Sequence, residues 1–134
     1  MPGAFVEPLG CAHSQQMMDL TDLAYPGYFR PETCRMGQYF GIRNAHGLLV
    51  AMGGERLCFD PWREISALCS HPDHAGKGLG TAVLRHILMH QRAMGARPWL
   101  WVTEHNPKAA ALYGRLGFQT VRQMDLHRLR RGTR

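Results

Sequence analysis

Three glycines alternate with other residues in the stretch HPDHAGKGLGTAV, His71–Val83, directly before a pattern typical of an amphipathic helix. Glycine weakens a helix, so Gly76, Gly78 and Gly80 at a helix entrance indicate a ligand that must come close to the backbone. Backbone N–H groups and the positive end of the helix dipole favour an anion at such a turn. A tight turn that needs small residues would explain one or two of these glycines. The third favours a ligand that carries phosphates.

Two familiar phosphate motifs do not fit this stretch. A Walker loop requires a glycine five residues before Gly76, where the chain has His71, and Ser or Thr after Lys77, where it has Gly78. A dinucleotide fingerprint requires glycine or alanine at the position of Thr81. The phosphate-bearing ligand is therefore expected to bind in another way.

The patterns before the glycines predict one helix and three strands. HSQQMMDLTDLA (residues 13–24) has apolar residues at helical spacing. RMGQYFGIR (35–43) and GLLVAMGG (47–54) are typical of strands, and NAHG between them predicts a hairpin. The next strand, REISALCS, leads into the glycine turn, and its alternation places Ile65, Ala67 and Cys69 on one face and Glu64, Ser66 and Leu68 on the other.

The patterns after the glycines alternate between helix and strand. The helix that follows the turn is expected to end at Gly95, and the apolar run PWLWVT predicts a strand in the middle of a sheet. NPKAAALYGRLG predicts a helix with Asn106 as its N-cap and Gly117 as its stop. FQTVRQMDLHRLR has strand character. The order of these elements indicates an α/β fold.

Length and composition limit the class of protein. A chain of 134 residues is expected to form a single domain, residues 1–134, and to bury a core without metal or disulfides. No apolar run approaches twenty residues, which excludes a bilayer-spanning helix. The start, MPGAFVEPLG, lacks the basic and then apolar build of a signal peptide, so we expect a cytoplasmic protein.

Cysteine and histidine spacing gives little support for a metal site. His86 and His90 stand four residues apart on a predicted helix, but no third ligand is evident, and solvated side chains explain them better. The cysteines show no CxxC spacing, which argues against zinc or a redox pair. We therefore expect no metal, and buried free thiols at Cys11, Cys34, Cys58 and Cys69.

The charge of the chain raises the question of nucleic acid. The net charge is +6, and after Val121 five arginines against one acid, Asp125, contribute +4 of it. A basic tail alone is usually a solvated end, and no aromatic stacking platform accompanies it. Nucleic-acid binding is therefore a weaker hypothesis than a small phosphate-bearing ligand.

Two longer motifs resemble those of one enzyme family. EISALCSHPDHAGKGLGTAVL resembles the acetyl-coenzyme A motif of the GNAT superfamily of N-acetyltransferases. LWVTEHNPKAAALYGRLGF, further along, is similar to the N-x-x-A-x-x-L-Y-x-x-x-G-F motif at the end of the substrate-side helix in the same family. YPGYF, MGQYFGIR and LLVAMGGERL resemble a bacterial subgroup. The resemblance implies a mixed, mostly antiparallel central sheet with splayed fourth and fifth strands, flanked by helices.

The resemblance also implies how acetyl-CoA, as co-substrate, would bind. Its pantetheine arm would bond to the free backbone of the fourth strand, and its pyrophosphate to the amides of the glycine turn. Ala75 departs from the family, which usually has Arg or Gln there, so one contact is absent unless Lys77 replaces it. Asn106 would hold the arm from the other side. The implied cofactor-binding residues are Leu68, Cys69, Ser70, Gly76, Lys77, Gly78, Leu79, Gly80, Thr81 and Asn106.

Catalysis requires a base for the amine, an oxyanion donor and an acid for the thiolate. Tyr113 matches the family tyrosine that resembles a general acid, although a core tyrosine is the alternative. Glu64 matches the glutamate that serves as the base in histone-acetylating members of the family. The alternative is that Glu64 is only a glutamate at a strand end. Glu104 is then the second candidate for the base. The oxyanion donor would be a strand amide near Cys69, whose own thiol we interpret as a small core group because only His71 could activate it.

Three functions are consistent with the sequence. The first is an N-acetyltransferase that transfers an acetyl group directly to a primary amine of a small molecule or peptide. The second is a module that binds CoA or acyl-CoA without turnover, and the third is a basic nucleic-acid binder. The acceptor, the acyl chain and a homodimer cannot be read from the sequence, and no membrane partner is expected.

Overall fold

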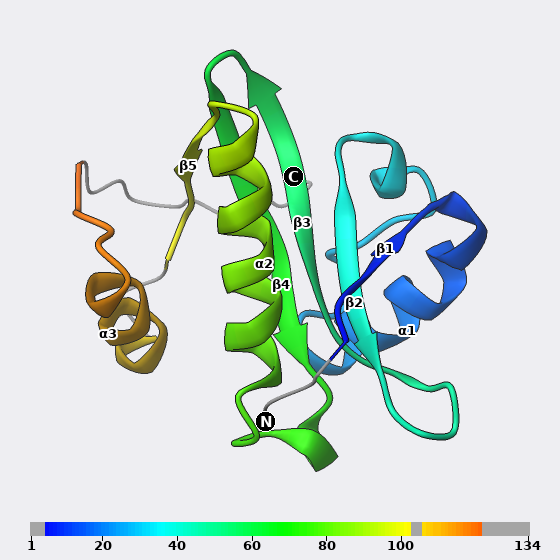
Figure 1. Cartoon of the computed structure of the whole chain (residues 1–134). Helices are drawn as coiled ribbons and strands as arrows, with labels where there is room; N and C mark the ends of the chain where they lie inside the picture. The colour runs from blue at the N-terminus through cyan, green and yellow to red at the C-terminus, as the bar shows by residue number, and fades with distance from the viewer. Residues whose placement is uncertain (1–4, 103–105, 122–134) are drawn as a thin grey trace, which may run out of the picture. The chain divides into compact units, whose positions relative to one another are not determined.

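The computed structural model describes residues 5–102 and 106–121, which fall into two compact units, Met1–Trp101 and Val102–Arg134. The first unit is a five-stranded sheet in the order β1-β2-β3-β4-β5 (Figure 1). The pairs β1–β2, β2–β3 and β3–β4 are antiparallel and the pair β4–β5 is parallel, so the predicted mixed, mostly antiparallel sheet is confirmed. The strands are β1 Glu7–Leu9, β2 Tyr39–Arg43, β3 Leu49–Phe59, β4 Trp62–Ser70 and β5 Arg97–Trp99.

Two helices cover opposite faces of this sheet. Tyr39 of β2 packs with α1 (Ser14–Ala24) in the main apolar cluster, whereas its neighbour Phe40 contacts His86 of α2 (Leu79–Ala93). Successive residues of a strand point to opposite faces, so α1 and α2 lie on different sides. Figure 1 shows α2 running along β3 and β4. Three short 3₁₀ helices complete the first unit: η1 Cys11–His13, η2 Thr33–Arg35 and η3 Pro72–His74.

Helices α1 and α2 bury part of the apolar side that their sequence patterns predict. Met17 and Leu20 of α1 join the cluster on that face, together with Met52 and Cys69. On the other face, Val83, Leu84 and Ile87 of α2 are wholly buried. Helix α2 ends with Gly95 at φ +71°, the left-handed conformation expected of the residue after a helix.

A bulge in β4 overturns the predicted alternation of that strand. Cys69 pairs with Met52 and Ser66 with Gly54, so Ala67 and Leu68 together oppose Gly53. Ala67 takes up the extra residue with φ +57°. As a result Ala67 and Cys69 lie in the α1-side cluster. Leu68 was expected on the same face as Glu64 and Ser66 but lies on the α2 side. A Cβ built on Gly53 would be 2.7 Å from Cδ1 of Leu68, which shows that this side chain packs over Gly53.

The second unit contains α3 (Pro107–Arg115). Asn106 caps it as predicted, because its Oδ1 accepts a hydrogen bond from the N–H of Ala109 at 3.2 Å. Gly117, with φ +96°, follows its end. Residues 118–121 form no regular element, and the rest of the predicted last strand and the basic tail lie outside the described residues.

The cysteine prediction is partly wrong. Cys11 and Cys34 form a disulfide with 5.3 Å between their Cα atoms. Cys11 lies in η1, directly before α1, and Cys34 lies in η2, which follows α1 in the chain. Cys58 is free but exposed, and Cys69 is free and buried as expected. Among the described residues, no group of three His, Cys, Asp or Glu side chains could hold a metal. No helix in the described ranges is long and apolar enough to cross a membrane.

Candidate active site

The glycine turn connects the end of β4 at Ser70 to the start of α2 at Leu79. Gly76 and Gly78 have φ of +79° and +74°, a left-handed conformation that side chains rarely adopt. Gly80 has no such constraint. A Cβ at any of the three would meet no atom within 4 Å. The fold therefore explains two of the glycines by their backbone, and the space beside all three is open to a ligand.

The first turn of α2 can bind an anion. It contains no acidic residue and no side chain that caps it, and its first intrahelical bond runs from the N–H of Ala82 to the carbonyl of Gly78. The preceding N–H groups of Leu79, Gly80 and Thr81 thus point out of the helix end. Lys77 adds an exposed cation, with its Nζ 3.4 Å from Nδ1 of His74. Ala75, the residue that departs from the family, is also exposed.

Strands β4 and β5 separate partway along their length. Their register pairs are Trp62 with Arg97, Arg63 with Pro98 and Glu64 with Trp99. Strand β4 continues to Ser70, while β5 is shorter than the predicted strand and ends at Trp99. Within the described ranges, the edge of β4 beyond Glu64 has no strand partner on that side. An extended ligand can bond to this edge as an added strand would, and the edge includes Leu68, Cys69 and Ser70.

Glu64 lies at the point where the two strands separate, in a hydrogen-bonded group of side chains. Its carboxylate is buried and accepts bonds from Nε and Nη2 of Arg56 at 2.7 and 2.8 Å. Arg56 also donates to the hydroxyl of Tyr28 at 3.3 Å, and that hydroxyl lies 2.6 Å from Oγ of Ser66. These hydrogen bonds, which Arg56 donates to Glu64, raise the pKa of Arg56. Glu64 and Ser66 share a face, as predicted.

Tyr39 lies beneath the same group of side chains. A Cβ at Gly54 would overlap the Tyr39 ring, so the ring lies across β3 only because residue 54 is glycine. Burial raises the pKa of Tyr39 above its ordinary value, and nearby Tyr28 adds to the effect. The hydroxyl is therefore protonated at neutral pH, and among the described residues it has no hydrogen-bond partner.

Cys69 is a core residue in this structure. Burial raises the pKa of its thiol to about 11, although a hydrogen bond with Thr21 lowers it somewhat. At neutral pH the sulfur is therefore an unreactive thiol. This environment agrees with the interpretation of Cys69 as a small core group rather than an acylated nucleophile.

The remaining predicted residues lie in the second unit or outside the described ranges. Tyr113, in α3, is partly buried, and its ring meets that of Phe118 edge to face at 5.8 Å. Asn106 precedes the same helix. Glu104 lies outside the described residues. The roles given to Tyr113 and Asn106 stay predictions.

Sequence reasoning missed most of the polar neighbours of Glu64. Arg56 and Tyr28 come from a strand and a loop whose patterns carry no motif. One signal was available, because a buried carboxylate needs a cation and Arg56 lies near the far end of the strand that pairs with β4. Tyr28 is far from Ser66 along the chain, so no local sequence pattern connects them, and only the fold brings the two side chains together.

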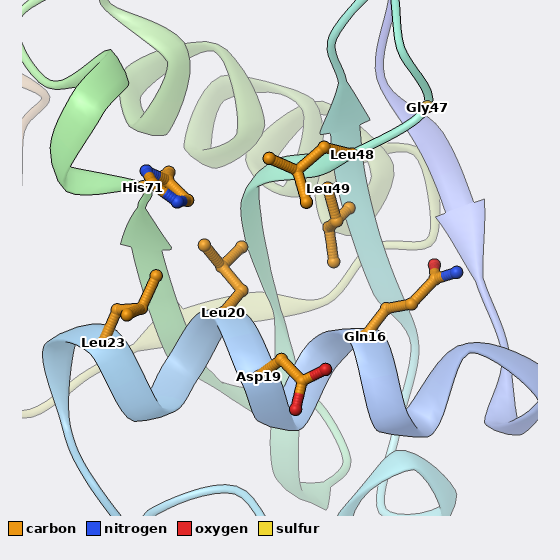
Figure 2. A pocket seen from close by; sticks show the side chains of 8 residues that line it. All are labelled: Gln16, Asp19, Leu20, Leu23, Gly47, Leu48, Leu49 and His71. Atoms are coloured by element: carbon orange, nitrogen blue, oxygen red, sulfur yellow. The ribbon is translucent and has the colours of Figure 1, made fainter.

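A separate cavity lies between α1 and the β2–β3 hairpin, with a volume of about 160 Å³. Figure 2 shows Leu20 and Leu23 of α1 facing Leu48, Leu49 and His71 across it. The cavity meets the candidate site only at His71, which follows β4.

Comparison with known proteins agrees with this geometry. The model of the acetyltransferase (GNAT) family matches residues 7–118. A GNAT-family protein from Novosphingobium aromaticivorans is 32% identical with a TM-score of 0.81, over 91% of this chain and 53% of that one. This chain therefore spans about half the length of that protein. The search among curated proteins found no match.

Two further structures share the fold at lower identity. The ribosomal-protein-S18-alanine N-acetyltransferase from Escherichia coli is 22% identical with a TM-score of 0.76, over 86% of this chain and 77% of that one. The aminoglycoside N-acetyltransferase AAC(6′)-Iy, solved in complex with CoA, is 13% identical with a TM-score of 0.74, over 94% of each chain. The match of the family model over residues 7–118, most of the chain, shows that this chain belongs to the GNAT acetyltransferase family.

Proposed function

We propose that the protein is an acetyl-CoA-dependent N-acetyltransferase that moves an acetyl group directly to a primary amine of a small molecule or peptide. The observation that carries this proposal is the edge of β4 that no described strand pairs with beyond Glu64, and that leads directly into the open glycine turn. A strand edge followed by a helix start suits a ligand with an amide-bearing arm and a pyrophosphate. The thioester supplies the acetyl group, and the chain supplies the binding and proton transfers.

The glycine turn and the β4 edge bind the co-substrate. The N–H groups of residues 76–81 take the pyrophosphate, and Lys77 adds positive charge beside it. The backbone of Leu68, Cys69 and Ser70 bonds to the arm as a strand would. A β4 amide beside Cys69 stabilises the negative charge that develops on the carbonyl oxygen. Asn106 would hold the arm from the other side.

Glu64 and Tyr113 handle the protons in this proposal. The amine attacks the acetyl carbon only when it is neutral, so a base must first remove a proton from the ammonium. Both oxygens of Glu64 already accept bonds from Arg56, which favours transfer through a water over direct contact. Tyr113 gives a proton to the sulfur as the carbon–sulfur bond breaks. The products are the N-acetyl amine and free CoA, in a cytoplasmic protein.

A measurement of CoA binding tests whether the pyrophosphate binds at the glycine turn. Gly78→Asp places a carboxylate where the phosphates would lie, and CoA affinity measured by calorimetry should fall sharply. Gly47→Asp is the matched control, because Gly47 also has a positive φ, +82°, and open space around it in the β2–β3 hairpin. Unchanged affinity in a folded Gly78→Asp variant would contradict the proposed pyrophosphate site.

A thiol-release assay with a panel of amines tests turnover. Tyr113→Phe removes only the hydroxyl, and the rate should fall by about 10²-fold or more while CoA binding survives. Glu64→Gln should lower the rate mostly at low pH, where the amine is protonated. If Tyr113→Phe matches the wild type, the tyrosine only packs. If Glu64→Gln changes the rate equally at all pH values, Glu104 or a water chain becomes the better candidate for the base.

Two observations favour a second function, CoA binding without turnover. Arg56 occupies both oxygens of Glu64, and Ala75 lacks the side chain that the family usually places at the pyrophosphate. A protein of this kind would bind CoA in the calorimeter and release no thiol with any amine of the panel.

A further inference from the structure

Trp99 carries a buried donor beside Glu64. It is the last residue of β5 and the register partner of Glu64, so the two side chains are neighbours on one face of the sheet. Its indole Nε1 is shielded from solvent, and no described residue accepts a hydrogen bond from it. Buried indole N–H groups normally have a partner. At this position, where β4 and β5 separate, a ligand between the strands can provide one.

An aromatic surface extends outward from Trp99. Its ring lies 6.2 Å from that of Phe59 and 5.7 Å from that of Trp101, measured between centroids. Trp62 is the register partner of Phe59 and lies two residues before Glu64, which places it on the same face. We call these four residues, Phe59, Trp62, Trp99 and Trp101, the aromatic shelf; it contains all three tryptophans of the chain.

Two rings of the aromatic shelf are exposed to solvent, and a cation–π contact within the chain holds a third in place. Phe59 is 59% and Trp101 56% exposed, more than an isolated packing role requires. The guanidinium of Arg97 lies over the ring of Trp62, 5.3 Å from its centroid, and steadies that end of the shelf. The exposed rings therefore offer apolar contact area, and at its inner end, where β4 and β5 separate, lie the buried Glu64 carboxylate and an N–H donor that no described residue uses.

These features together describe one class of acceptor. An amine at Glu64 that also carries a carbonyl group two bonds away can place that oxygen at the neighbouring strand, within reach of the Trp99 indole. A simple alkylamine has no such oxygen and would leave the indole N–H without a partner. An apolar or aromatic side chain on the same carbon would lie on the shelf.

We propose that the acceptor is an α-amino acyl compound, meaning an amino-acid amide or a peptide N-terminus with an apolar first side chain, and that Trp99 binds its carbonyl oxygen. This inference rests on the proposed acetyl transfer and adds the substrate class. Trp99 acts as an acceptor-binding residue: its N–H donates to the carbonyl and thereby orients the amine beside Glu64. Phe59 and Trp101 contact the first side chain.

Two probes isolate the contribution of the carbonyl. Phenylalanine amide and phenethylamine share the phenyl ring and the primary amine, and only the first has the carbonyl. In the thiol-release assay, Trp99→Phe should lower kcat/KM for phenylalanine amide by about tenfold and change it less than about twofold for phenethylamine. The two amines differ in basicity, but this cancels when each variant is compared with the wild type on the same probe. Trp101→Phe, another shelf ring, is the control and should affect both probes equally.

The remaining outcomes each decide the question. An equal fall for both probes with Trp99→Phe would show that the indole only packs, and the inference would be wrong. If Trp99→Phe does not fold, the wild type decides: kcat/KM per neutral amine must favour phenylalanine amide by about tenfold. Acetylation of other amines but of neither probe would reject the substrate class and leave the acetyl transfer standing. CoA binding without transfer to any amine would instead reject the proposed function.

Discussion

Replacement of Arg56 should destabilise the protein more than neutralisation of its partner Glu64. The carboxylate side chain is 2% exposed, whereas that of Arg56 is 31% exposed. Arg56→Gln leaves a buried charge without its two strong hydrogen bonds, and breaking such pairs costs about 3–5 kcal/mol in other proteins. Water can enter where the partly exposed Arg56 side chain was, so we expect about 2 kcal/mol here. Glu64→Gln leaves a cation that solvent can reach, and we expect about 1 kcal/mol.

Urea unfolding of the two single variants and the double variant measures this difference. In Arg56→Gln the loss of stability comes from a buried charge without a counter-charge. The deficit should therefore be largest at neutral pH and shrink in acid, where protonation of carboxylates removes that charge. The double variant should recover most of the stability that Arg56→Gln loses at pH 7, because it no longer buries a charge.

Two results would refute this reasoning. Equal losses for Arg56→Gln and Glu64→Gln would mean that solvent reaches both partners alike. A loss for Arg56→Gln that does not change between pH 5 and pH 8 would mean that Glu64 is not left as a buried charge.

Four shorter predictions concern other parts of the chain. Gly54→Ala should cost about 3 kcal/mol in urea unfolding, because the new methyl would overlap the Tyr39 ring and lie 2.6 Å from the carbonyl oxygen of Gln38; Gly10→Ala, with open space, should be near neutral. Ala75→Arg should tighten CoA binding by about 1 kcal/mol in calorimetry if a pyrophosphate contact is missing. Burial, and then His90, lowers the pKa of His86, so unfolding free energy should fall as pH drops below about 6.5, and His86→Gln should flatten that slope. The unfolded chain should show two reactive thiols without reductant and four with it, since two of its four cysteines form a disulfide and the other two are free.

Local signals predicted most of the helices and strands. Helix α1, the β2–β3 hairpin, the glycine turn and the Asn106 cap all depend on residues close together in the chain, and all are present. The family resemblance predicted the mixed, mostly antiparallel sheet and the separation of β4 from β5. Strand β1, only three residues long, has too short a pattern to be recognised.

Contacts between distant residues could not be predicted in the same way. The disulfide joins residues 23 positions apart, and spacing alone gave no reason to pair them. The bond between Tyr28 and Ser66 likewise depends on how the loop after α1 meets β4. The bulge at Ala67 was invisible, because the sequence of β4 alternates well enough for a regular strand. The residues beside Glu64 that sequence analysis missed are therefore the ones supplied by other elements.

The bulge at Ala67 lets β4 keep two separate contacts on one side of the sheet. Ser66 and Cys69 are three positions apart, and both pair with residues that share a face, Gly54 and Met52. A regular strand of the same length would point them to opposite faces, so either the thiol would leave the core beside Thr21 or the hydroxyl would lose Tyr28. Removal of one residue between them would instead give a regular strand in which both still share a face. Homologues one residue shorter here can therefore keep both contacts without a bulge, whereas those of the present length need it.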